Sequence, residues 1–182
     1  TVYISNCLKL DTISLVSFNY KDLSLGVLSS IPLGIVMNLL DKTEWKWTKN
    51  MTEKTEFFLS QVLGKDGGAI YGLVFATLIG TTAGIGEELF FRGLVQTIVQ
   101  NHFGMKIGIV TSATIFGILH IVTPMYALCA GLVGAYFSMI WFASGNLLVP
   151  IVAHATYDIF AISFVSHFLY KKYKKSKIII IQ

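Results

Sequence analysis

The stretch "AIYGLVFATLIGTTAGIGEELFFRGL", residues 69–94, decides the fold of this chain. It carries no charge from Ala69 to Gly86, which is long enough for a membrane-spanning helix of about 17 to 25 residues. Two carboxylates and an arginine (Glu87, Glu88 and Arg92) then follow within the same apolar pattern. An ionisable side chain in a hydrophobic helix is costly unless it is paired or hydrated. These three residues are therefore candidates for a functional site.

The composition predicts an all-α, polytopic integral membrane protein. Of the 182 residues, 54% are hydrophobic and only 13% are charged, whereas a soluble domain carries about 25% charge. The net charge is +4, but five basic residues lie in the tail "KKYKKSK" at residues 171–177. Such a cluster is typical of an anchor facing anionic lipid, and an unspecific solvated tail is the alternative. Nothing resembles a base-reading module, so no nucleic-acid partner is expected.

Three regions follow from the charge pattern. Residues 1–22 mix polar and apolar types and are predicted to be a peripheral N-terminal segment. Because the chain begins with Thr1, we expect that an N-terminal piece is missing. Residues 23–168 are predicted to be embedded in the membrane, and residues 169–182 form the basic tail.

About five transmembrane helices are predicted around a polar intramembrane cavity. The polar stretch 41–68 contains Trp45 and Trp47, which suit a membrane interface. We expect a break or kink in the helix around "AGIG", residues 83–86. Lysines in the polar stretch and in the tail favour placing both on the cytosolic side or its equivalent. The predicted spans are 23–40, 69–100, 106–122, 124–142 and 147–168.

Helical spacing sorts the charges of residues 84–94. Glu88 and Arg92 are four residues apart and share a helix face, so they can pair. Glu87 is rotated by about 100° and can point elsewhere. The pair Glu88–Arg92 has a purely structural alternative, an ion pair that holds helices together.

Two further motifs place histidines on apolar helices. "FGILH" puts Phe116 and His120 on one helix face, and "HATYD" does the same for His154 and Asp158. Isolated histidines in such helices are often only hydrogen-bonded, as we expect for His102 and His167 near helix ends. A glutamate, a histidine and a histidine–aspartate pair on three helices instead predict one polar site.

The three motifs, EExxxR, FxxxH and HxxxN/D in this order, resemble those of the CAAX prenyl protease and bacteriocin-processing family (Abi, or type II CAAX endopeptidase-like, intramembrane proteases). The resemblance covers about residues 20–168. It implies an intramembrane glutamate endopeptidase in which Glu87 activates a water and His120 holds and polarises that water. It also implies that Glu88 and Arg92 orient the catalytic glutamate, with Phe116 as a supporting residue.

In the same family, His154 and residue 158 would form the oxyanion site. Many members have Asn where this chain has Asp158. Asn donates a hydrogen bond outright, whereas Asp donates only when protonated or acts by orienting His154. The role of Asp158 in the oxyanion site is therefore open at this point.

The resemblance implies a membrane protein or lipidated peptide as substrate, membrane lipid as surroundings, and no cofactor. Eukaryotic CAAX enzymes carry a further histidine soon after the FxxxH histidine, whereas "HIVTP" follows here. This favours the broader branch of bacterial inner membranes or of plastid and other organelle membranes.

Three alternatives to this reading are open. A zinc protease could use the same histidines and acids, but the HExxH spacing is absent and Arg92 would oppose a cation. A non-catalytic scaffold or bacteriocin-immunity-type protein could use the same fold. A transporter or proton relay also uses intramembrane acids and histidines, but no internal repeat is evident.

Overall fold

The computed structural model describes residues 12–63 and 69–181, and every regular element in these ranges is helical. The first eleven residues of the predicted peripheral segment lie outside the described part. The elements are η1 (Ile13–Leu15), α2 (Tyr20–Asp41), α3 (Lys46–Leu63), α4 (Ala69–Glu88), η2 (Leu89–Gln96), α5 (Thr97–Phe103), α6 (Met105–Leu119), α7 (Pro124–Ser144) and α8 (Leu148–Ile181).

Four segments of the described chain are long and apolar enough to cross a membrane, which confirms the predicted polytopic membrane protein. They are Tyr20–Asp41, Ile70–Phe103, Pro124–Ser144 and Leu148–Lys172. The remaining predicted span, 106–122, corresponds to α6, a shorter apolar helix of 15 residues. At about 1.5 Å per residue α6 is shorter than the roughly 30 Å of a hydrocarbon core.

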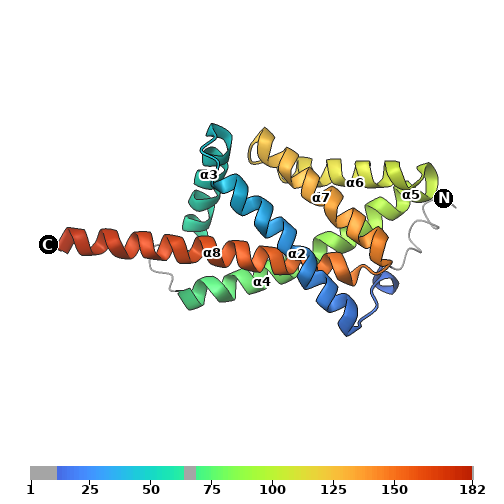
Figure 1. Ribbon diagram of the computed structural model, residues 1–182, viewed down its shortest axis with the longest axis horizontal. Coiled ribbons are helices and arrows are strands. Elements are labelled where there is room, and N and C mark those ends of the chain that lie inside the picture. The colour runs from blue at the N-terminus through green and yellow to red at the C-terminus, as the bar shows by residue number, and fades with distance from the viewer. Residues whose placement is uncertain (1–11, 64–68, 182) are drawn as a thin grey trace.

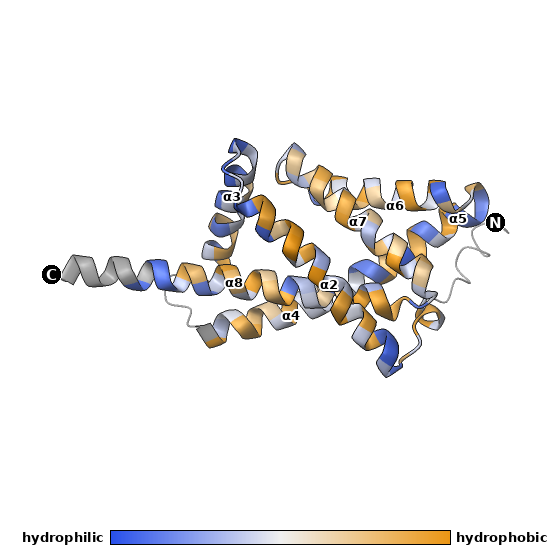
Figure 2. Ribbon diagram, viewed as in Figure 1, coloured by the Kyte–Doolittle hydropathy of each residue, from blue (hydrophilic) through white to orange (hydrophobic). Residues whose placement is uncertain are grey.

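Helix boundaries differ from those predicted where capping residues define them. Helix α2 begins at Tyr20, because the side chain of Asn19 accepts a hydrogen bond from the backbone N–H of Asp22 at 2.8 Å. The polar stretch 41–68 contains a helix of its own, α3. In Figure 2, α3 contains many hydrophilic residues, whereas α2 is largely hydrophobic.

Of the break or kink predicted around residues 83–86, the break is wrong, because the chain stays helical from α4 through η2 to α5. Gly84 does not end the helix but lets it approach α8. A Cβ atom at Gly84 would lie 2.8 Å from the backbone nitrogen of Ala155 and 2.9 Å from the carbonyl oxygen of Ile151. The glycine therefore marks a helix contact, not a turn.

The irregularity of this long helix lies one turn later, in η2, which is a π-helix. Two of its carbonyl oxygens accept hydrogen bonds from side chains. Ser112 of α6 donates to the carbonyl of Phe91 at 2.9 Å, and Thr97 donates to that of Arg92 at 3.0 Å. π-Helical turns occur frequently at functional sites, and this one contains Arg92.

Helices α4 and α8 lie side by side along much of their length (Figure 1). Glycines on α4 make this possible, because Cβ atoms at Gly72 and Gly80 would come within 3.0 Å of Ser166 and Ile159 respectively. Small residues at helix interfaces in membranes allow such close backbone approach. The contact brings Glu88, at the end of α4, next to His154 of α8.

Asn146, in the turn between α7 and α8, ties the first described residues to the helical bundle. Its side chain accepts from the backbone N–H of Ser17 at 3.0 Å and donates to the Ser17 carbonyl at 2.6 Å. It also donates to Asp22 at 2.7 Å. The turn itself uses Gly145 in the left-handed conformation, with φ at 68°.

The close α4–α8 contact gives a stability prediction. Gly84→Ala should lower the free energy of unfolding by about 1 to 3 kcal/mol, because its methyl group meets the backbone of α8. Gly86→Ala is the matched control, since a Cβ there meets nothing within 4 Å, and alanine favours helix by up to about 1 kcal/mol. Thermal unfolding in detergent measures both; equal melting temperatures for the two variants would contradict the packing account.

Candidate active site

The centre of the polar cluster is an ion pair within one helical segment. Arg92 Nη1 donates to Glu88 Oε1 at 2.8 Å, and both side chains are 0% exposed. The pairing predicted from the i,i+4 spacing is thus present, although it runs from the last residue of α4 into the π-helix. Breaking one partner of such a buried pair would leave an uncompensated charge.

The guanidinium of Arg92 is held on its other sides by α7 and by aromatic rings. Its Nη2 donates to the carbonyl oxygen of Gly134 at 2.7 Å. A Cβ at Gly134 would lie 3.2 Å from Nη2 and 3.3 Å from the ring of Phe116, so a side chain there would crowd the site. The guanidinium carbon also lies 4.7 Å from the ring centre of Phe116 and 5.3 Å from that of Phe137.

His154 of α8 joins this ion pair from the opposite helix. Its Nδ1 lies 2.8 Å from Glu88 Oε1, and its Nε2 lies 3.4 Å from Asp158 Oδ2. Carboxylates accept hydrogen bonds and do not donate them. The imidazolium form, with a hydrogen on each nitrogen, therefore satisfies both contacts.

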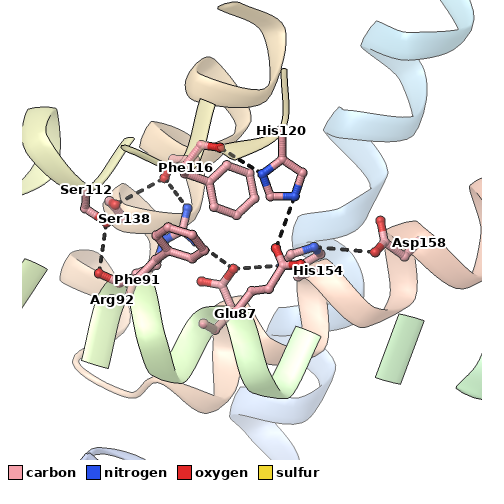
Figure 3. A network of polar contacts seen from close by, with 11 residues as sticks. Glu87, Phe91, Arg92, Ser112, Phe116, His120, Ser138, His154 and Asp158 are labelled. Atoms are coloured by element: carbon pink, nitrogen blue, oxygen red, sulfur yellow. Dashed lines mark hydrogen bonds and ion pairs between the residues drawn. The ribbon is translucent and has the colours of Figure 1, made fainter. Parts of the chain in front are cut away.

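Glu87 and His120 form the more exposed half of the cluster (Figure 3). Glu87 Oε2 lies 3.4 Å from His120 Nε2, and the two side chains are 31% and 30% exposed. The other ring nitrogen of His120, Nδ1, lies 2.8 Å from the carbonyl oxygen of Phe116. Because that carbonyl only accepts, Nδ1 carries a hydrogen and Nε2 is the nitrogen that exchanges a proton next to Glu87.

The structure brings the seven predicted site residues together from three parts of the chain. Glu87 points toward His120 at the end of α6, whereas Glu88 contacts His154 of α8, which is the division that helical rotation predicted. His102 instead bonds to the carbonyl of Ile98 in its own helix at 2.8 Å. The seven are Glu87, Glu88, Arg92, Phe116, His120, His154 and Asp158.

The contributions of α7 were not found from the sequence. Gly134 provides a carbonyl, and Phe137 stacks on His154 with ring centres 4.8 Å apart. Both residues stand in an uncharged run, where a glycine and a phenylalanine are typical of any packed membrane helix. No pattern in that run distinguishes a site residue from a packing residue.

Some polar atoms of the buried half have no hydrogen-bond partner among the described residues. They include Glu88 Oε2 and Arg92 Nε. An unsatisfied buried polar atom costs about 1 to 3 kcal/mol. As for metals, no group of three or more His, Cys, Asp or Glu side chains in residues 12–63 and 69–181 is arranged to hold an ion.

Comparisons with known proteins agree with this geometry. A family model described as type II CAAX prenyl endopeptidase Rce1-like matches residues 69–160, just over half of the chain and all seven predicted site residues. Searches of curated proteins and of solved structures found no significant match. The family match confirms the resemblance carried by the three motifs. The chain belongs to the type II CAAX prenyl endopeptidase Rce1-like family, a family of membrane proteases.

Proposed function

We propose that this protein is an intramembrane endopeptidase that hydrolyses peptide bonds with a water activated by Glu87. The observation that carries the proposal is the pair Glu87–His120. Its atoms are 3.4 Å apart, and its side chains are about a third exposed while Glu88 and Arg92 are fully buried. A substrate and a water can reach this pair and not the ion pair behind it.

In the first step, a water on the open side of the pair contacts the partly exposed carboxylate of Glu87 and the imidazole of His120. Glu87 takes one proton from this water as general base, and the oxygen attacks the carbonyl carbon of the scissile peptide bond. His120 keeps the water oriented because its own ring is fixed through Nδ1 by the carbonyl of Phe116. General base catalysis of this kind contributes about 10²- to 10⁴-fold.

The attack turns the carbonyl oxygen into an oxyanion, and His154 is the donor that suits it. His154 lies beside the Glu87–His120 pair in Figure 3. Its Nδ1 lies 2.8 Å from Glu88 Oε1, whereas its Nε2 lies at the longer distance of 3.4 Å from Asp158 Oδ2. The Nε2–H is therefore the less tightly bound of the two. A positively charged donor fixed in advance stabilises the developing negative charge.

The tetrahedral intermediate collapses when its C–N bond breaks. The proton that Glu87 took from the water passes to the leaving nitrogen, directly or through His120. The products are a new carboxyl terminus and a new amine, and the site returns to its starting protonation. Glu88 and Arg92 remain unchanged, and they act by holding His154.

The substrate class in this proposal is a membrane-associated protein or lipidated peptide. Two features support it: the site lies among helices long and apolar enough to span a membrane, and the chain belongs to a CAAX endopeptidase family. Such substrates reach the site along the membrane, so the bound water is the reactant that must come from the aqueous side.

The general base can be tested by substitution. Glu87→Gln keeps the shape of the side chain but cannot take a proton, so kcat/KM should fall by about 10²- to 10⁴-fold. Cleavage of a quenched peptide library by the purified protein measures this, with Glu53→Gln on the exposed face of α3 as the control. A Glu87→Gln variant as active as the wild type, or no cleavage by either protein, would favour a non-catalytic scaffold.

The metal-free reading predicts that a strong chelator leaves the rate unchanged. The ion pair Glu88–Arg92 places a cation next to the acids, which opposes a second cation at the same place. The rate is measured after prolonged dialysis against chelator, with a known zinc protease as the positive control for metal removal. Loss of activity that added zinc restores would overturn this reading.

Two substitutions distinguish the possible roles of Asp158, which are orientation of His154 and direct donation to the oxyanion. If Asp158 acts by orienting His154, Asp158→Asn keeps an acceptor for Nε2–H and should retain most activity. Asp158→Ala should lose about 10- to 100-fold in kcat, the value of a hydrogen bond to a charged group. Equal losses in both variants would instead require the negative charge itself.

A further inference from the structure

We propose that Phe137 is a positioning residue for His154, as the counterpart of Phe116, which serves His120. This inference rests on the proposed function, since it concerns the residue that prepares the oxyanion donor. Phe137 lies in α7 and is 0% exposed. None of the three sequence motifs includes it.

The two phenylalanines make equivalent contacts. The ring of Phe116 stacks on His120 with centres 4.2 Å apart and planes inclined by 23°. The ring of Phe137 stacks on His154 at 4.8 Å and 19°. Each histidine of the site therefore has one phenylalanine against the face of its ring.

The stacking is specific rather than a result of general crowding. Phe116 also lies near His154, but at 6.1 Å and with the planes inclined by 65°. Among the described residues, the face-to-face contact of His154 is thus with Phe137. Phe137 belongs to α7 and His154 to α8, so this ring comes from a neighbouring helix and not from the helix of the histidine. The two helices are joined by a tight turn at Gly145.

Arg92 contacts both phenylalanines. Its guanidinium carbon is 4.7 Å from the ring centre of Phe116 and 5.3 Å from that of Phe137. Figure 3 shows Phe116 between Arg92 and His120. A cation against an aromatic face is an attractive contact. One arginine therefore helps to fix the two phenylalanine rings that stack on the two histidines.

A stacked ring supplies what the hydrogen bonds of His154 leave undetermined. The contacts at Nδ1 and Nε2 fix the direction of the ring within its plane. A flat surface against the ring face restrains its tilt out of that plane. Tilt decides where the Nε2–H points, and a misplacement of about 1 Å can cost about 10²-fold in rate.

The first experiment detects the contact without substrate. In protein labelled at histidine and phenylalanine, ring-to-ring nuclear Overhauser effects should connect Phe137 with His154. Phe137→Leu should shift the ring signals of His154, and Phe116→Leu those of His120, because each loses the ring current of its partner. Phe142→Leu is the control from the same helix, since Phe142 is 64% exposed, and it should shift neither histidine.

The second experiment measures the consequence for the reaction. Phe137→Leu should lower kcat by about 10²-fold and leave KM nearly unchanged, at a temperature well below its own unfolding transition. Phe142→Leu should keep the wild-type kcat. Should Phe137→Leu not fold, Phe137→Met and the nuclear Overhauser measurement on the wild type provide the same test.

The outcomes separate this inference from the proposed function. A wild-type kcat in Phe137→Leu, while cleavage still depends on Glu87, would overturn the positioning role and leave the protease intact. Absence of any nuclear Overhauser contact between Phe137 and His154 would overturn it as well. If no cleavage depends on Glu87, the proposed function fails and the positioning role falls with it, even where the ring contact is detected.

Discussion

One carboxylate oxygen holds the site together: Oε1 of Glu88 accepts from Arg92 at 2.8 Å and from His154 at 2.8 Å. The first contact lies within the long helix that contains η2, and the second crosses to α8. The same arginine reaches the backbone of α7 through Gly134. The anion thus joins two segments, and its arginine partner adds α7 as the third. The position of Glu87 follows because it is the neighbouring residue.

The two consecutive glutamates divide the site into a structural and a chemical part. Glu88 is fully buried and has its charge balanced by neighbours, so it offers little to a substrate. Glu87, one residue earlier, faces His120 and is partly exposed. The rotation of about 100° per residue in a helix is sufficient to give two identical side chains different tasks.

The class of fold could be predicted from the sequence, and because charges in apolar helices are few and their spacing defines helix faces, so could the proximity of the seven candidate residues, whose roles stay predictions. Glu88–Arg92 and His154–Asp158 were recognisable for this reason. The predicted break near Gly84 failed because a glycine in a helix can mark a close contact as well as an end. Gly134 and Phe137 could not be predicted, since their contacts depend on which helix lies opposite. The periodicity of a single helix does not predict which helices pack against each other.

The intrahelical spacing of the polar groups has a consequence for how the protein enters the membrane. Glu88 and Arg92 belong to one membrane segment, His154 and Asp158 to another, and His120 bonds to the carbonyl of Phe116 within α6. These groups therefore bring a partner within their own segment when it inserts, before the bundle exists, whereas Glu87 meets its partner His120 only when the helices assemble. This lowers the cost of placing isolated ionisable groups in lipid. Assembly of the helices then adds contacts between segments, such as His154 with Glu88, to groups that are already partly satisfied.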